Sequence, residues 1–179
     1  DRSMTAHELG HQWFGDLVTV TTWDDLWIKE GMATLLETES GRAYSDYNGT
    51  SRLFGGHFEV ADNEPVIDPA MPPEGKYTSG PYGHSAWVLT QIRRQLGDAA
   101  FFATLRSVMR DYAYSSITTE QFLAFFAPQV PAAFMGRLRT ALYAHALPKL
   151  IVTEHEGETA SYGVRVDDAD SALVLPIEL

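Results

Sequence analysis

The chain has 179 residues, which is enough for one hydrophobic core with or without a small appendage. Apolar residues make up 45%, so the composition is that of a globular protein and excludes a wholly disordered one. The net charge of −11 argues against nucleic-acid binding through a basic patch. An acidic surface favours solubility, and it would also suit a cationic substrate such as a peptide amino terminus.

The chain has no cysteine, which excludes disulfides and thiolate metal sites. No apolar run approaches the ~20 residues of a membrane-spanning helix, and no signal peptide is visible. The chain begins at Asp1 without an initiator methionine and enters a motif almost at once, so we expect it to be a fragment of a longer protein. The sequence therefore assigns no localisation.

Apolar periodicity and capping residues predict a helical protein as far as residue 148. Asp24 or Asp25 can cap the second helix, Asp98 the fifth, and Thr118 with Gln121 matches a capping box. Residues 16–23 are predicted to be extended or a loop, and the proline- and glycine-rich residues 62–81 a loop. The predicted helices span 3–14, 26–40, 44–60, 82–96, 98–112, a segment from about 119, and 131–147.

After Pro148 the pattern changes to short β segments. The stretches LIVTEH, ASYGVRV and SALVLPIEL are typical of strands, and the EGE and DDAD stretches between them are typical of turns. We therefore predict a mainly α fold, α+β overall, with a helical domain at 1–148 and the start of a small β domain at 149–179.

The pattern H-E-x-x-H occupies residues 7–11. On a helix, His7 and His11 share one face and can bind one zinc ion. Glu8 lies about 100° around the helix from His7, where it can act as general base on a zinc-activated water without binding the metal. The alternative is a solvated helix with two surface histidines.

A catalytic zinc ion takes three protein ligands and keeps one position open. Glu30, on the second predicted helix, is the candidate for the third ligand. The resulting site would hold one Zn2+ per chain with two neutral imidazoles and one carboxylate. A net positive charge would remain on the metal and help to activate water.

The segments AHELGHQWFGDLVT and WDDLWIKEGMATLLE resemble the aminopeptidase N-type gluzincins, which include leukotriene hydrolases. The resemblance implies zinc held by His7, His11 and Glu30, with Glu8 as the base. It also implies that the chain is the helical C-terminal half of a thermolysin-like zincin catalytic domain. Two positions depart from the family pattern, because Asp16 and Lys29 stand where the family usually has Asn.

The family has a catalytic tyrosine at the start of a helix, and often a second tyrosine five residues earlier. Tyr82 and Tyr77 fit these two positions. The resemblance implies that the Tyr82 phenol donates a hydrogen bond to the oxyanion. Residues 83–85, Gly-His-Ser, depart from the usual x-Lys-Gly, and the alternative is that Tyr82 only packs at the helix start.

Thr34 and Glu37 lie on the same helix face as Glu30 and are candidates to orient a ligand histidine, or else are solvated or capping groups. Lys29 is about 100° around the helix from Glu30 and need not pair with it. The remaining histidines have no ligand spacing. The phenylalanines at 101, 102, 122, 125, 126 and 134 are predicted to be helix-bundle core.

The expected function is zinc-dependent peptide hydrolysis, with removal of N-terminal residues implied by the resemblance alone. The family recognises the free amino group with a segment upstream of H-E-x-x-H, on a β-rich half of the catalytic domain. That half is thus an expected partner besides the peptide substrate, and we expect the isolated chain to have little or no activity. The alternatives are a non-catalytic gluzincin-fold binding module and an endopeptidase of another gluzincin branch.

Overall fold

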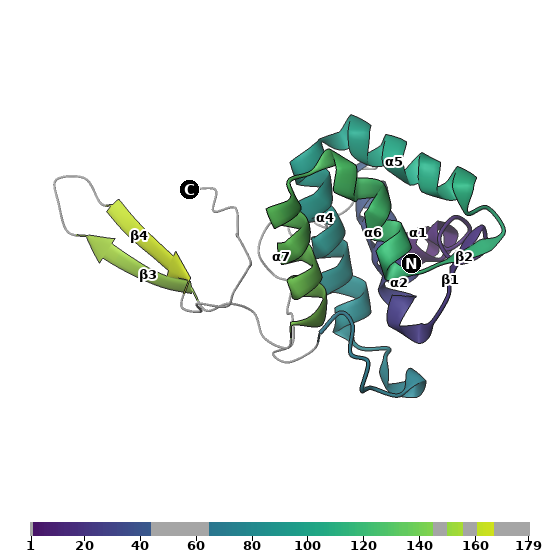
Figure 1. Ribbon diagram of the computed structural model, residues 1–179, viewed down its shortest axis with the longest axis horizontal. Helices are drawn as coiled ribbons and strands as arrows, with labels where there is room; N and C mark the ends of the chain where they lie inside the picture. The colour runs from purple at the N-terminus through teal and green to yellow at the C-terminus, as the bar shows by residue number, and fades with distance from the viewer. Residues whose placement is uncertain (1, 44–64, 145–149, 156–160, 167–179) are drawn as a thin grey trace.

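The computed structural model describes residues 2–43, 65–144, 150–155 and 161–166, and helices dominate this part of the chain (Figure 1). The mainly α prediction is confirmed. The helices are α1 (Arg2–Gly10), α2 (Leu26–Ala43), α4 (Ser85–Leu96), α5 (Asp98–Asp111), α6 (Thr119–Phe126) and α7 (Ala132–Tyr143).

In the described residues, two short pairs of strands accompany the helices. Strand β1 (Val18–Val20) pairs in parallel with β2 (Ser115–Ile117). This pairing joins the segment that follows α1 to the segment that precedes α6. Strands β3 (Leu150–His155) and β4 (Ser161–Val166) form an antiparallel hairpin, which lies to one side of the helices in Figure 1. The first two predicted C-terminal strands are confirmed. The third predicted strand, the predicted helix 44–60 and the predicted boundary near 148 lie outside the described residues.

The core is built from the apolar faces of the helices. Phe101, Phe122 and Phe126 are fully buried, and the other three phenylalanines of the predicted group pack against them partly buried, so the core prediction is confirmed. The Trp27 indole meets the Phe122 ring edge-on at 5.7 Å between centroids, a favourable aromatic geometry. Helix α2 therefore has its first turns anchored in the core.

The helix ends differ from the predictions in four places. Helix α1 ends at Gly10 rather than residue 14, α2 continues through Gly41 to Ala43, and α7 ends at Tyr143. A π-helical turn (Gly80–His84) precedes α4, which begins three residues later than predicted.

The caps also differ in part from the predictions. Thr118 and Gln121 form the predicted capping box at the start of α6. Asp98 does not cap α5, because Gly97 occupies the N-cap and the Asp98 carboxylate instead accepts two hydrogen bonds from Arg93. A 3-10 turn (Trp23–Asp25) precedes α2, and the Asp25 carboxylate accepts hydrogen bonds from Thr22 and from Thr119 at the start of α6.

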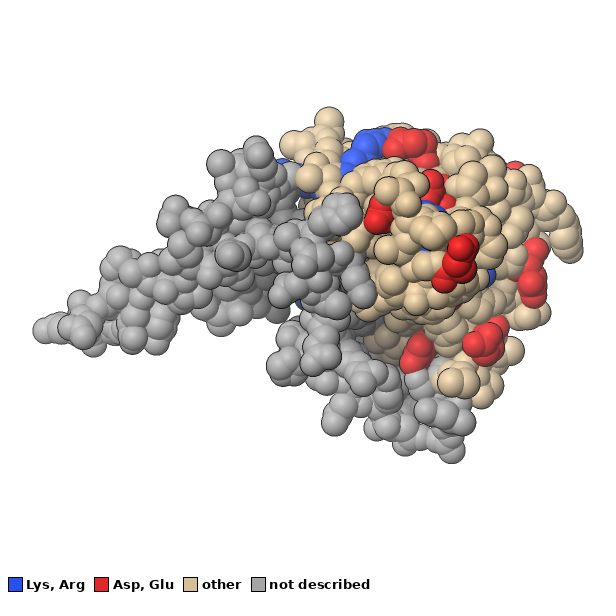
Figure 2. Space-filling view, turned by 90° about the horizontal axis from the view of Figure 1, so that it is seen from below, with Lys and Arg blue, Asp and Glu red and all other residues tan. Residues whose placement is uncertain are grey.

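Acidic side chains are spread over the face of the molecule shown in Figure 2, with few basic side chains among them. This agrees with the 24 acidic and 13 Lys and Arg residues of the sequence. Among the residues described, no helix combines the length and apolar character needed to cross a membrane.

Candidate metal centre

Helix α1 and the turn that follows it place the two motif histidines side by side. The ring centroids of His7 and His11 are 4.9 Å apart, with the rings nearly perpendicular. His11 is the first residue beyond α1. From here the backbone hydrogen bonds span three to five residues, and the Asp16 N–H donates to the His11 carbonyl at 2.9 Å.

Helix α2 brings a buried carboxylate to these rings. Glu30 is 4% exposed, and its Oε2 lies 3.4 Å from His7 Nε2 and 3.2 Å from His11 Nε2. The potential ligand atoms of the three residues all lie within 4.8 Å of one another. The two predicted helices thus bring together the three residues that the sequence singled out as ligands.

The outer nitrogen of each histidine faces an oxygen. His11 Nδ1 is 3.0 Å from the Phe14 carbonyl, and a carbonyl only accepts, so this bond requires a proton on Nδ1. His7 Nδ1 is 3.4 Å from Glu37 Oε2, and Glu37 is therefore in the position predicted for an orienting group. Both arrangements leave Nε2 of a neutral imidazole free to bind a cation beside Glu30.

Thr34, the other candidate for orienting a histidine, is placed differently. Its carbonyl accepts a hydrogen bond from Thr38 Oγ1 at 3.0 Å. Within the described part of the chain, no hydrogen bond joins the Thr34 side chain to either histidine. The hydrogen bonds of the described residues therefore give no support to an orienting role for Thr34.

Lys29 does pair with Glu30, although the sequence suggested that it need not. Its Nζ lies 3.2 Å from Glu30 Oε1, whereas the contacts of the histidines are with Oε2. Neighbouring helical positions are about 100° apart, but the long lysine stem carries the ammonium group across the helix surface to the neighbouring side chain. The two oxygens of Glu30 are therefore shared between Lys29 and the histidines.

Glu8 and Tyr82 each neighbour His7, Glu8 along the chain and Tyr82 through its ring. Glu8 is exposed on α1 next to His7. The Tyr82 ring, in the π-helical turn, stacks on the His7 ring at 6.0 Å between centroids. Burial, and then the Glu30 carboxylate, raise the pKa of Tyr82 to about 12, so the phenol keeps its proton in the neutral range. Tyr77 and Glu8 add smaller contributions that raise the pKa of Tyr82 in the same direction.

The loop that leads to Tyr82 is fixed by a buried lysine that the sequence analysis did not single out. Lys76 is 8% exposed, and its Nζ donates to Asp24 Oδ1 and to the Asp68 carbonyl. The half-exposed rings of Trp23 and Tyr77, the chain neighbours of Asp24 and Lys76, also meet edge-on, with 6.0 Å between their centroids. Lys76 therefore ties the loop carrying Tyr77 to the turn that starts α2.

Comparison with known proteins identifies the family. The family model for the peptidase family M1 domain matches residues 2–133. The chain belongs to peptidase family M1. This confirms the resemblance to the aminopeptidase N-type gluzincins.

Two relatives and one solved structure show how much of an M1 protein the chain represents. Probable aminopeptidase 2 of Sulfurisphaera tokodaii is 32% identical over 131 residues, which are 67% of this chain and 17% of that protein. Aminopeptidase N of Haemonchus contortus is 31% identical over 136 residues, 69% of this chain and 14% of that protein. A mutant M1 zinc metallopeptidase of Deinococcus radiodurans bound to a Tyr-Ser-Ala substrate has a TM-score of 0.71 at 28% identity, over 83% of this chain and 34% of that one. The chain thus spans less than a fifth of the two relatives and about a third of the Deinococcus chain.

The residues of this M1 chain fit the zinc that the family implies. Two neutral imidazole nitrogens and one carboxylate are a donor set that zinc takes in catalytic sites. The three donors come from α1, from the turn that directly follows it and from α2, which packs on α1, and Glu30 is already buried among them. Each histidine also has its second nitrogen held by an oxygen, as ligand histidines in proteins usually do.

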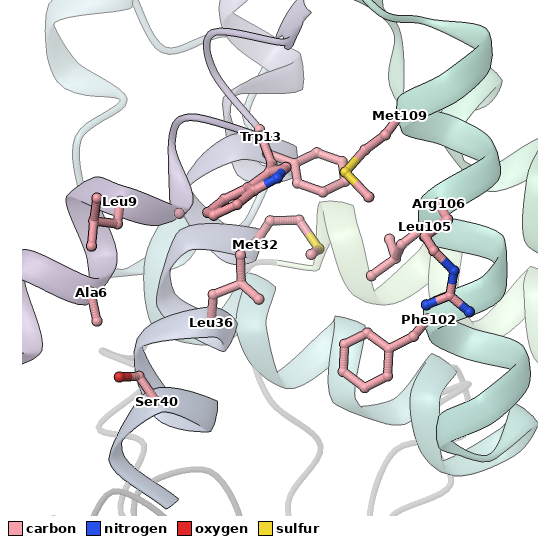
Figure 3. A pocket seen from close by; sticks show the side chains of 12 residues that line it. Ala6, Leu9, Trp13, Met32, Leu36, Ser40, Phe102, Leu105, Arg106 and Met109 are labelled. Atoms are coloured by element: carbon pink, nitrogen blue, oxygen red, sulfur yellow. The ribbon is translucent and has the colours of Figure 1, made fainter. Parts of the chain in front are cut away.

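A separate pocket of about 380 Å³ lies between α1, α2 and α5 of the M1 chain (Figure 3). Its lining is mainly apolar, and none of the residues at the metal centre takes part in it. Figure 3 shows Leu9 and Trp13 on one side and Phe102 and Met109 on the other. The pocket is therefore a feature distinct from the chemistry of the H-E-x-x-H motif.

Proposed function

We propose that this M1 chain binds one zinc ion through His7, His11 and Glu30 and supplies the catalytic residues of an aminopeptidase. The observation that carries the proposal is the convergence of these three side chains, with donor atoms within 4.8 Å of one another, from separate parts of the chain. The exopeptidase part is supported by the names of the relatives and by the tripeptide bound to the Deinococcus structure.

Glu8 acts as the general base. Bound zinc supplies Lewis-acid chemistry that makes water acidic enough to be deprotonated near neutral pH. Glu8 is exposed next to His7, so its carboxylate can accept the proton of the attacking water and later give it to the leaving amine.

Tyr82 donates a hydrogen bond to the oxygen that becomes negative as the peptide carbonyl is attacked. Its raised pKa keeps the phenol protonated for this role. The stacking on His7 fixes the ring beside the metal centre. The three ligands, the base and the donor together supply the main groups that hydrolysis of a peptide bond needs.

The isolated chain is expected to turn over substrate poorly. It spans 34% of the Deinococcus chain, so a complete M1 protein of that size contributes further walls to the substrate cleft. We expect recognition of the free amino group to come from the upstream β-rich half, a partner that the family resemblance implies. Activity is therefore to be measured on the complete protein that contains this chain.

The test is Glu8→Gln in the complete protein. The variant is expected to keep about one zinc per molecule by elemental analysis and to lose hydrolysis of amino-acid anilides, because the amide cannot accept the proton. The matched control is Glu74→Gln, in an exposed turn of the loop, which is expected to keep both. Full turnover by Glu8→Gln would refute the assigned base.

Two further measurements separate the proposal from its alternatives. His7→Ala is expected to lose both zinc and turnover. If the protein were a non-catalytic module, the wild type itself would show no turnover that a chelator abolishes. A peptide with a blocked amino terminus is expected to resist cleavage. Cleavage of the blocked peptide would indicate an endopeptidase instead.

A further inference from the structure

The two oxygens of the Glu30 carboxylate face different partners. Oε2 is the oxygen near the histidine nitrogens, at 3.4 and 3.2 Å, and Oε1 lies 3.2 Å from Lys29 Nζ. The family pattern usually has a neutral Asn at position 29. In this chain a full positive charge therefore lies against the predicted third ligand.

The pairing of these two residues is mutual. Glu30 is 4% exposed, and a buried carboxylate needs a counter-charge or hydrogen bonds. Within the described residues, Lys29 is the only Lys or Arg that forms an ion pair with Glu30, and Glu30 is the only carboxylate paired with Lys29. Lys29 is thus the counter-charge of the ligand.

Lys29 affects Glu30 mainly through its positive charge and less by holding the carboxylate in place. Glu30 is enclosed by the packing of α2, and the next residue, Gly31, lies directly against Ser85. These contacts limit the movement of the carboxylate even without the lysine. The lysine side chain itself is 26% exposed, so water partly screens its charge.

A cation bound at the histidines would interact with the same Glu30 carboxylate that pairs with Lys29. With both imidazoles neutral, the donor set carries a charge of −1, which Lys29 offsets. Two groups that compete for one carboxylate disfavour each other, and this coupling is reciprocal. We infer that Lys29 stabilises the metal-free form of the protein and weakens its affinity for zinc. This inference rests on the proposed zinc site.

The experiment compares four variants of the complete protein. Lys29→Met removes the charge and keeps the length of the side chain, Lys29→Gln also keeps a neutral donor, and Lys29→Arg keeps the charge. Arg110→Met is the matched control, because it removes one positive charge from a side chain that is 70% exposed on α5. The dissociation constant for zinc is measured by competition with a chromophoric chelator, and Tm is measured with zinc and after its removal.

Lys29→Met and Lys29→Gln are expected to bind zinc about tenfold more tightly, within the range in which outer contacts tune metal sites. Their metal-free Tm is expected to fall while the zinc-saturated Tm stays near that of the wild type. Lys29→Arg and Arg110→Met are expected to match the wild type in affinity. A structural role for Lys29 would instead lower both Tm values equally and leave the affinity unchanged.

The inference is overturned if removing the charge leaves zinc affinity unchanged or weakens it, or if Lys29→Arg behaves like Lys29→Met. Where metal-free Lys29→Met does not fold, the comparison is made with Lys29→Gln. The proposed function itself would be contradicted if the wild-type protein bound no zinc, or if His7→Ala left its zinc binding unchanged.

Discussion

Asp25 joins the start of α2 to the start of α6 through one buried carboxylate. Its Oδ1 accepts hydrogen bonds from Thr119 N at 2.7 Å and Thr119 Oγ1 at 2.8 Å. Its Oδ2 accepts from Thr22 N at 3.0 Å and Thr22 Oγ1 at 2.8 Å. Because Glu30 lies five residues further along the same segment, this network fixes the helix that carries the predicted third ligand. We predict that Asp25→Ala destabilises the protein strongly.

The magnitude follows from the exposure of the two threonines. Thr22 is exposed, so its donors can turn to water, whereas Thr119 is 6% exposed and its two donors would lose their acceptor. Hydrogen bonds to charged groups contribute about 1.5–3 kcal/mol each, which gives about 3–6 kcal/mol for the Thr119 pair. The variant no longer buries a carboxylate, which offsets part of this cost. We therefore expect a loss of about 3 kcal/mol in the free energy of unfolding.

The assay is urea unfolding followed by tryptophan fluorescence. Trp27 is a suitable reporter, because its Nε1 donates to Thr119 Oγ1 at 2.9 Å within the same network. Asp16→Ala serves as the control, since Asp16 is exposed and its contact is with Gln12, and we expect a change within about 0.5 kcal/mol. A loss of less than about 1 kcal/mol in Asp25→Ala would show that the buried donors find other partners and would refute the reasoning.

The remaining predictions concern the residues around the metal centre. Tyr82→Phe is expected to lower kcat by about 100- to 1000-fold with unchanged zinc content, because the oxyanion loses its donor, and a kcat close to that of the wild type would contradict the role. Glu37→Gln is expected to weaken zinc binding by about 10- to 100-fold, because His7 Nδ1 loses its carboxylate partner. Chelator competition measures the second effect, and an unaltered affinity would show that Glu37 is only a solvated surface group.

The parts of the site that depend on local spacing could be predicted from the sequence. His7 and His11 meet because four residues span about one helical turn, and Glu37 reaches His7 because it shares a helix face with Glu30. The main helices and the phenylalanine core were predictable for the same reason, since apolar periodicity specifies which face is buried.

The remaining features depend on contacts that no local pattern encodes. Lys76 and Asp24 are 52 residues apart, and nothing in either segment indicates that they pair. The Phe14 carbonyl reaches His11 only because the chain leaves the α-helix after Gly10, where the sequence predicted four more helical residues. Lys29 shows a third case, because the angle between neighbouring helical positions does not limit where a flexible ammonium group can lie.

Close backbone approach explains why three elements can meet at this centre. A Cβ atom on Gly10 would lie 3.1 Å from the Cα of Ala33, so the missing side chain lets α1 pack tightly on α2. A Cβ atom on Gly31 would lie 2.6 Å from the Cβ of Ser85, which a side chain at that position would not tolerate. Each glycine is one residue away from a predicted ligand, His11 or Glu30. The distances among the histidines, Glu30 and Tyr82 therefore depend on the absence of a side chain at Gly10 and Gly31.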